Sequence, residues 1–136
     1  MRMTTYVNFP GNCAEAFRYY EEHLGAVRGM MMTHADAPAT AAGALPPEWQ
    51  KAVLHATVTI AGGEISGADI PNAQPMRSAY LTLHVDSDAE AERVYAALAD
   101  GGTVLMKMEQ TFFASRFGQV RDRFGINWMI LTQARQ

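Results

Sequence analysis

The sequence predicts an α+β protein built from two tandem βαβββ modules. Three observations lead to this prediction: short segments of alternating apolar and polar residues, two amphipathic segments with a helical period, and the same order of these elements in both halves of the chain. The tripeptide Ala-Glu-Ala lies near the start of both amphipathic segments, at residues 14–16 and 89–91, so the repeat is 75 residues long. That period is too long for a solenoid and fits a duplicated module.

The first module is expected to begin with a strand and a helix. Residues 4–9 are β-branched and aromatic and end at a Pro-Gly turn, as is typical of a strand. We expect a helix over residues 13–24. Asn12 is its expected N-cap, Glu15 completes a capping box, and Gly25 closes the C-terminus. Three further strands are expected at 26–34, 53–60 and 64–68, the last two joined as a hairpin.

The second module repeats this order. A strand over 80–85 leads through Asp86-Ser87-Asp88, which offers N-cap side chains, into a helix over 89–99 that Asp100-Gly101-Gly102 ends. Three more strands are expected at 103–108, 116–121 and 126–132. We expect a single domain over 1–136, in which a linker at about 69–78 joins a module of about residues 1–70 to one of about 78–136.

Composition argues against several classes of partner. The 136 residues are 49% hydrophobic and 18% charged, as in an ordinary globular protein with a real core. The formal net charge of -3 provides no basic surface for a phosphate backbone, so we expect no nucleic-acid partner. No apolar run approaches the roughly 18 to 20 residues of a membrane span, so we expect no membrane partner. A single cysteine and no secretion signal predict a cytoplasmic protein.

Six short strings spread over both modules are specific enough to indicate a family. They are YVNFPGNCAE at 6–15, AFRYYEEHLG at 16–25, PPEW at 46–49, LHA at 54–56, TFFA at 111–114 and DRFGINW at 122–128. Together they resemble the PhnB-like branch of the vicinal-oxygen-chelate superfamily, which includes glyoxalase I, extradiol dioxygenases and bleomycin-resistance proteins. The resemblance implies eight strands in two curved mixed sheets around a central cleft, with the helices outside. In the best-known members this cleft holds a divalent metal that chelates neighbouring substrate oxygens.

The resemblance also implies where that metal would bind. Matching the family's motifs places its four usual ligand positions at Thr5, Ser66, Tyr80 and Met129. These side chains are not a customary set for Zn, Fe, Mn or Ni, so we expect the usual metal site to be absent and assign no metal ligand. Two alternatives stay open. The alignment could shift by two residues and bring His84 to the cleft, or His55, His84 and Glu64 could form an unusual divalent-metal site.

Strand alternation predicts which side chains line the cleft. In 80–85 the apolar residues 81, 83 and 85 suit the helix-facing side, which leaves the other three pointing inward, and correspondence between the modules extends the set. Gln110 and Phe113 are added as pocket rim, because exposed aromatics beside loops often contact ligands. The expected ligand-binding residues are His55, Thr57, Tyr80, Thr82, His84, Gln110, Phe113, Phe117, Gln119, Asn127 and Met129. Such a mixture of apolar walls and a few polar groups suits a small organic ligand.

Candidate catalytic residues are few. His55 and His84 could each act as a general base, although a strand histidine more often only hydrogen-bonds a neighbour. Cys13 lies at a helix start, where the dipole lowers a thiol pKa, but it has no basic neighbour in sequence. Trp49 is expected at the pocket rim, and the loop 35–50 is either a lid or a mobile insertion. Phe124 and Trp128 are expected in the core.

Two functions remain open from the sequence. The first is a small-molecule-binding protein without the usual metal site, in the manner of the resistance proteins. The second is a metal-dependent lyase, isomerase or dioxygenase that acts on a small oxygenated substrate. PhnB-like sequences are also labelled methyltransferase-like or DNA-binding, but no Gly-x-Gly-x-x-Gly follows a strand, and the charge disfavours DNA. We also expect a homodimer, because members of the superfamily commonly pair modules across chains.

Overall fold

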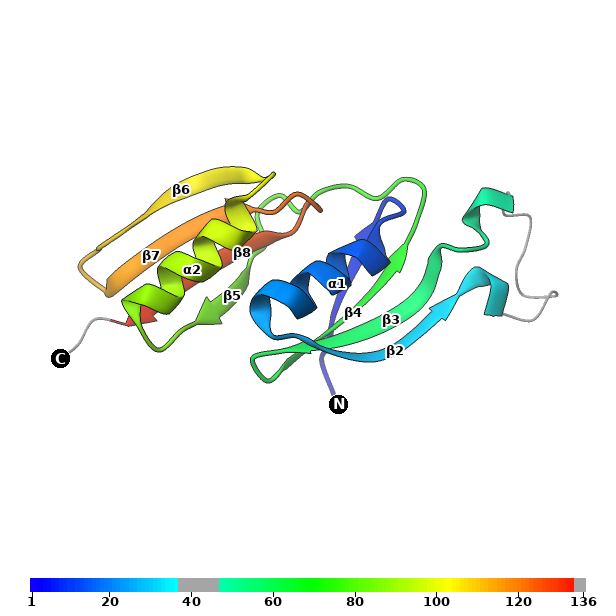
Figure 1. The fold of residues 1–136 in the computed structure, drawn as a ribbon, viewed down its shortest axis with the longest axis horizontal. Helices are drawn as coiled ribbons and strands as arrows, with labels where there is room; N and C mark the ends of the chain where they lie inside the picture. The colour runs from blue at the N-terminus through cyan, green and yellow to red at the C-terminus, as the bar shows by residue number, and fades with distance from the viewer. Residues whose placement is uncertain (37–46, 134–136) are drawn as a thin grey trace. The chain divides into compact units, whose positions relative to one another are not determined.

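Residues 1–36 and 47–133 are described by the structure, a computed structural model, in which the chain forms two units, Met1–Gln74 and Pro75–Gln136. Each unit contains one helix and one four-stranded sheet, in the order strand, helix, strand, strand, strand (Figure 1). The predicted α+β fold with a duplicated βαβββ module is confirmed.

In the first unit, the helix covers one face of a mixed sheet with the strand order β1-β4-β3-β2. The elements are β1 (Thr5–Phe9), α1 (Cys13–Leu24), β2 (Val27–Thr33), β3 (Val53–Ile60) and β4 (Gly63–Asp69), with short 3-10 helices at His34–Asp36 and Pro47–Trp49. β1 runs parallel to β4, and the other neighbours are antiparallel. The two central strands, β4 and β3, therefore carry the side chains that are most enclosed.

The core of this unit forms between α1 and the sheet. Phe9 and Phe17 are fully buried and their rings meet edge to face, with centroids 5.8 Å apart. A Cβ atom on Gly67 would lie 2.9 Å from Cζ of Phe17. Only glycine therefore lets α1 lie this close to β4 without a shift of the ring.

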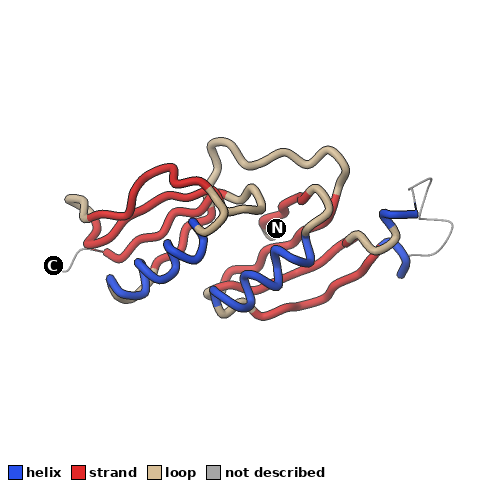
Figure 2. The backbone as a smooth tube through the Cα atoms, turned by 45° about the horizontal axis from the view of Figure 1, so that its top comes forward, coloured by secondary structure: helices blue, strands red, loops and turns tan. Residues whose placement is uncertain are grey.

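The second unit repeats the arrangement with the strand order β5-β8-β7-β6. Its elements are β5 (Leu81–His84), α2 (Asp88–Ala99), β6 (Thr103–Glu109), β7 (Ala114–Arg121) and β8 (Asn127–Gln133). β5 is parallel to β8, as β1 is to β4. In Figure 2 each helix runs along one face of its own sheet, which leaves the opposite face of each sheet uncovered by its own helix.

The amino end of α1 is capped differently from the prediction. Asn12 makes no side-chain capping bond, and its Oδ1 is buried without a hydrogen-bond partner among the described residues. Oδ1 of Asp69 instead accepts from the amides of Gly11, at 3.1 Å, and Cys13, at 2.9 Å. A charged cap from the end of β4 replaces the local one, because a carboxylate is favoured at the positive end of the helix dipole.

The other predicted helix ends are confirmed. Gly25 adopts the left-handed conformation at the end of α1, with φ of 66°. Ser87 caps α2 by accepting a hydrogen bond from the amide of Glu90 at 3.1 Å, and Asp100 ends that helix. Phe124 and Trp128 are buried, as expected. Among the described residues, neither helix is long and apolar enough to cross a membrane.

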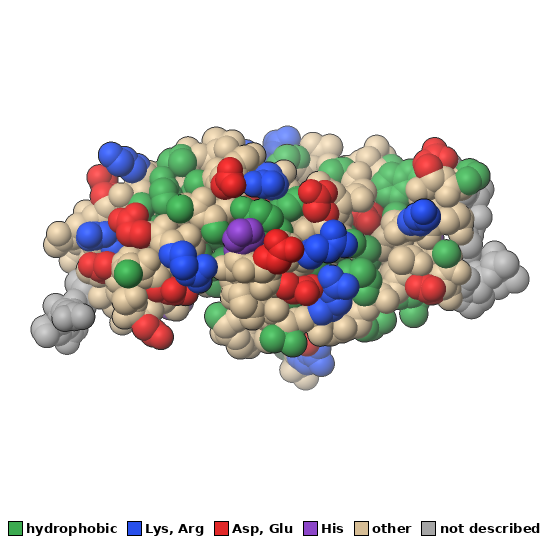
Figure 3. Space-filling model, in the orientation of Figure 1, with side chains coloured by type: hydrophobic (Ala, Val, Ile, Leu, Met, Phe, Trp, Pro, Cys, Tyr) green, Lys and Arg blue, Asp and Glu red, His purple; other side chains and the backbone are tan. Residues whose placement is uncertain are grey.

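Charges of both signs are mixed on one face of the molecule. On the face drawn in Figure 3, Asp and Glu side chains lie among Lys and Arg side chains rather than in a patch of one sign. Several large apolar side chains are nevertheless exposed on β2 and β6, one edge strand of each sheet, including Val27 at 67% and Val104 at 49%. Edge strands with exposed apolar residues are surfaces on which another chain can pair.

Candidate functional site

Most of the predicted ligand-binding residues lie on the face of the second sheet that α2 leaves uncovered. Strand pairing places Thr82, Met129 and Gln119 side by side, and Oγ1 of Thr82 lies 3.8 Å from Sδ of Met129. The neighbouring row contains His84, Leu131 and Phe117. This register confirms the predicted alternation on β5, in which Thr82 and His84 lie on one face. That these residues bind a ligand stays a prediction.

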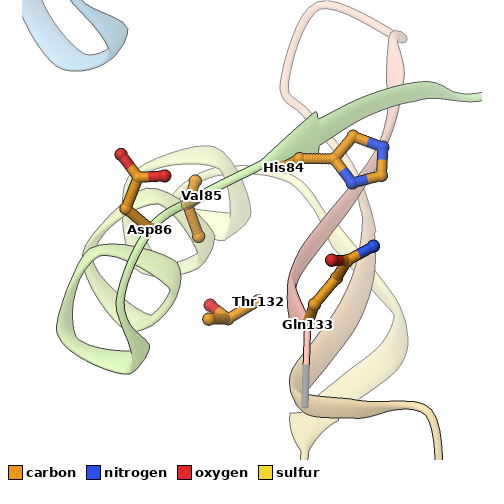
Figure 4. Close-up of a pocket in the computed structure, with 5 residues that line it drawn as sticks. All are labelled: His84, Val85, Asp86, Thr132 and Gln133. Atoms are coloured by element: carbon orange, nitrogen blue, oxygen red, sulfur yellow. The ribbon is translucent and has the colours of Figure 1, made fainter. Parts of the chain in front are cut away.

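A pair of adjoining hollows lies where β5 and β8 end and α2 begins. One, of about 380 Å³, is lined by His84, Val85, Asp86, Thr132 and Gln133 (Figure 4). The other, of about 550 Å³, shares three of those residues and is lined also by Ser87, Asp88, Gln110 and Ser115. We call the two together the α2 hollow. It brings His84 and Gln110, both predicted from the sequence, to one place.

The side chains of the α2 hollow differ in whether their hydrogen-bonding groups are already used within the protein. Oγ1 of Thr132 donates to the carbonyl oxygen of Ser87 at 3.0 Å, and Ser115 donates to the Asp88 carboxylate at 2.6 Å. These groups are already paired. The side chains of His84, Asp86, Gln110 and Gln133, by contrast, make no hydrogen bond or ion pair with another described residue. In Figure 4 the side chains of His84 and Gln133 point to the same side of their strands.

Two carboxylates give the α2 hollow an acidic character. Asp86 is exposed just before the helix, and Asp88 begins it. Arg116 lies 3.7 Å from the Asp88 carboxylate but is held more closely by Glu92, at 3.1 Å. The hollow therefore offers one free carboxylate, an imidazole and two amides, a set that can hydrogen-bond a polar molecule on several sides.

In the first unit, the structure joins His55 to a residue that the sequence did not single out. The hydroxyl of Tyr6 lies 3.2 Å from Nδ1 of His55, and the two rings stack with centroids 5.7 Å apart. Thr57 lies on the same face, beside Ser66 and, through it, Tyr6. The family resemblance instead points to Thr5, the residue before Tyr6 on β1. A shift of one residue along a strand moves the side chain to the other face, so Tyr6 was overlooked.

Asn127 is enclosed and its polar atoms are in use. Its Nδ2 donates to the carbonyl oxygens of Arg77 and Ala79, at 3.0 and 3.1 Å, and its Oδ1 accepts from Nε of Arg121 at 2.9 Å. A ligand contact would break one of these bonds, so Asn127 holds the segment before β5 in place. Tyr80, at the end of that segment, is half-buried.

The aromatic residues near β7 form a row. Phe113 is 47% exposed, and its ring meets that of the buried Phe117 at 5.1 Å and that of the exposed Phe112 at 5.2 Å. Trp49 is half-buried beside Gly11 in the first unit. The lid hypothesis for 35–50 rests chiefly on residues 37–46, which lie outside the described residues.

The strand register also shows which residues stand beside the expected metal positions. Ser66 is flanked by Tyr6 and not Thr5, and Met129 by Thr82 and not Tyr80. Phenol, hydroxyl and thioether groups do not make a customary set for a divalent metal of the superfamily's kind. Within either unit, the described residues contain no cluster of three or more His, Cys, Asp and Glu able to hold a metal ion. The residues at and beside the expected ligand positions thus do not fit the divalent metal that is usual in the superfamily.

Cys13 is unsuited to nucleophilic chemistry. Its side chain is fully buried at the start of α1. Burial, and secondarily the negative charge of Asp69, raises the pKa of the Cys13 thiol to about 12. The thiolate is the reactive form, so the helix dipole considered from the sequence is outweighed.

Comparisons with known proteins show the family of this chain. A model of the 3-demethylubiquinone-9 3-methyltransferase family matches residues 1–131. Protein YjdN of Escherichia coli K12 is 36% identical over 96% of this chain and 94% of its own. The crystal structure of protein PA1353 from Pseudomonas aeruginosa has a TM-score of 0.84 at 35% identity and covers 98% of both chains. A PhnB protein from Bacillus cereus, described as a putative 3-demethylubiquinone-9 3-methyltransferase, has a TM-score of 0.81 at 23% identity, covering 97% of this chain and 99% of its own.

Proposed function

We propose that this chain, which belongs to the 3-demethylubiquinone-9 3-methyltransferase family, binds a small polar molecule without a metal ion. The family is the PhnB-like branch of the glyoxalase and bleomycin-resistance superfamily, whose best-known members use a divalent metal. The observation that carries the proposal is the α2 hollow. There His84, Asp86, Gln110 and Gln133 come together with hydrogen-bonding groups that no other described residue uses. A hollow of several hundred Å³ is of the size that small-molecule sites have.

The chemistry of the α2 hollow favours a ligand that donates hydrogen bonds. The free carboxylate of Asp86 and the amide oxygens of Gln110 and Gln133 are acceptors, and His84 can accept through one ring nitrogen. A hydroxyl- or amine-bearing compound would satisfy them together. An anionic compound would meet the repulsion of Asp86 and Asp88, although the helix N-terminus offsets part of it.

The methyltransferase named in the family's description is not part of this proposal. The chain carries no Gly-x-Gly-x-x-Gly after a strand, the usual fingerprint of a nucleotide-cofactor site. The metal-dependent lyase, isomerase or dioxygenase is set aside because the expected ligand positions carry hydroxyl, phenol and thioether groups. Both alternatives can be tested together with the binding proposal.

A thermal-shift panel tests the proposal. It contains amino alcohols, sugars, carboxylic acids, S-adenosylmethionine and the ions Zn, Ni, Mn and Fe, each measured with and without EDTA. We expect a hydroxyl- or amine-bearing compound to raise Tm in the presence of EDTA, because a ligand stabilises the state that binds it. His84→Ala and Asp86→Ala should each weaken that compound's binding by about tenfold, or about 1.4 kcal/mol.

The matched control for Asp86→Ala is Glu15→Ala, which removes an exposed carboxylate from the first turn of α1 in the other unit. It should leave binding unchanged. A panel in which only a metal or S-adenosylmethionine raises Tm would replace the proposal by one of the enzyme alternatives. Equal binding by the wild type and both α2-hollow variants would place the ligand elsewhere.

We further propose that the protein forms a homodimer in the cytoplasm. The edge strand β6 exposes Val104, Leu105 and Met106, and the edge strand β2 exposes Val27 and Met30. Pairing between chains would cover such edges. The fully buried Cys13 thiol suits a reducing compartment, since it is the one cysteine in the chain.

Light scattering checks the dimer. The wild type should have twice the mass of one chain, and Val104→Lys should shift the population toward the monomer, because a charge would be buried at the paired edge. Ala96→Lys, which adds the same charge to the exposed surface of α2, should leave the mass unchanged. A wild-type protein of single-chain mass at micromolar concentration would contradict the proposal.

A further inference from the structure

The contact between Tyr6 and His55 determines which nitrogen of the His55 imidazole donates a hydrogen bond and which accepts one. A neutral imidazole has one nitrogen that donates a hydrogen bond and one that accepts, and the partner of one nitrogen decides which is which. Here the partner of Nδ1 is the Tyr6 hydroxyl, at 3.2 Å. His55 is the one hydrogen-bonding partner that the Tyr6 hydroxyl has among the described residues.

The phenol is the expected donor in this pair. Partial burial, and to a smaller extent Cys13, raises the pKa of Tyr6 above its ordinary value, so the hydroxyl keeps its hydrogen at neutral pH. A phenol O–H is a stronger acid than an imidazole N–H, and the lone pair of an imidazole nitrogen is the better acceptor of the two. The hydrogen of Tyr6 therefore points at Nδ1.

We propose that Tyr6 fixes His55 as the Nε2–H tautomer and so makes it a hydrogen-bond donor for a ligand with an acceptor oxygen, a carboxylate or a carbonyl. Tyr6 acts here as a positioning residue, through His55. The ligand part of this inference rests on the proposed small-molecule-binding function and extends it from the α2 hollow to the uncovered face of the first sheet. The tautomer part stands on the ligand-free protein alone.

Neighbouring groups on that face favour the same ligand chemistry. Oγ1 of Thr57 accepts a hydrogen bond from the amide of Met30 at 3.1 Å, which leaves its own hydrogen to be donated. Asn8 is exposed two residues after Tyr6, on the same side of β1, and supplies an amide. The carboxylate on this face, Glu64, lies 3.5 Å from the Arg2 guanidinium, which offsets its charge. An amine would find no lone pair at His55, whereas an acceptor oxygen finds donors.

Long-range proton–nitrogen NMR of the ¹⁵N-labelled full chain tests the tautomer. The spectra are recorded at pH 8.5, where an ordinary imidazole is neutral, and His55 is assigned by the signals lost in His55→Gln. We expect a pyridine-type shift at Nδ1 and a pyrrole-type shift at Nε2. Tyr6→Phe keeps the ring but removes the hydroxyl, and should move both shifts toward the average of a tautomer mixture.

The control is Tyr19→Phe, which removes the hydroxyl of a tyrosine whose ring packs on a different histidine, His23, with centroids 4.1 Å apart. It should leave the His55 signals in place. A pyridine-type shift at Nε2 of the wild type would overturn the tautomer, and so would Tyr6→Phe signals identical to those of the wild type.

Titration with acetate and with methylammonium tests the ligand chemistry. Acetate should shift the Nε2 signal of His55 saturably, methylammonium should not, and Tyr6→Phe should weaken the acetate response about fivefold, as for the loss of one hydrogen bond. The assigned ligand class would be overturned if the tautomer is fixed as Nε2–H but the Nε2 signal of His55 does not shift with acetate, or shifts more with methylammonium. Failure of the proposed function is distinguishable, because it shows as an absence of compounds that raise Tm and depend on His84 and Asp86.

Discussion

Replacing Asp69 with alanine should lower the free energy of unfolding by about 4 kcal/mol, because two buried backbone amides and one part-buried amide would lose their acceptor. The Asp69 carboxylate is 5% exposed and accepts from Gly11 and Cys13 with one oxygen and from Val53, at 2.8 Å, with the other. Asp69, at the end of β4, thereby joins the amino end of α1 to the start of β3. Urea unfolding followed by circular dichroism measures the loss.

Two further variants separate the causes. Asp69→Asn keeps one acceptor oxygen and should lose less than Asp69→Ala. Asp36→Ala removes an exposed carboxylate whose one hydrogen-bonding partner among the described residues is Thr33, and should change the free energy of unfolding by less than about 0.5 kcal/mol. If Asp69→Ala stays within 1 kcal/mol of the wild type, the three amides have found other partners and the account of the α1 terminus is wrong.

Asn127→Leu should cost about 3 kcal/mol and release the segment that precedes β5. Leucine has a similar shape but would leave the Arg121 guanidinium and the carbonyl oxygens of Arg77 and Ala79 without their partner. Arg121 also donates to the carbonyl oxygen of Met76 at 2.7 Å, so the two side chains together hold residues 76–79. Urea unfolding gives the energy, and the rate of tryptic cleavage after Arg77 reports the release.

Gln119→Leu provides the comparison for Asn127→Leu. Gln119 is a half-buried amide on the same sheet face that makes no hydrogen bond with another described residue. This variant should keep the wild-type stability and the wild-type cleavage rate. Unchanged cleavage after Arg77 in Asn127→Leu would show that the segment is held by other contacts, and would leave Asn127 available as the ligand-binding residue that the sequence predicts.

Local patterns were sufficient to predict the elements of both units. The helix expected over 13–24 is observed as Cys13–Leu24, and the strand expected over 53–60 as Val53–Ile60. Amphipathic periods and strong turn residues determine such boundaries within a few neighbours in sequence. The cap of α1 could not be found this way, because Asp69 lies 56 residues from Cys13 in sequence and only the pairing of β4 with β1 brings it there.

The candidate site was predictable only in part. Alternation correctly grouped Thr82 with His84 on β5, and Gln110 was expected at a pocket rim because it stands beside loop aromatics. Asp86 was interpreted only as helix-cap chemistry, and Gln133 was not considered. Both matter to the α2 hollow because it forms where the ends of β5 and β8 meet, and a strand pairing of this kind leaves no local signal. Tyr6 was not predicted because the family match pointed to Thr5, whereas the residue that pairs with Ser66 is Tyr6.

The most direct test of the central claim is a crystal structure of the protein with the compound from the panel that raises Tm most in the presence of EDTA. The account predicts density for that compound in the α2 hollow, within hydrogen-bond distance of His84 and Asp86, and no metal at its oxygens. Density that shows the compound coordinated to a metal ion, or bound at a site that neither residue touches, would contradict the account.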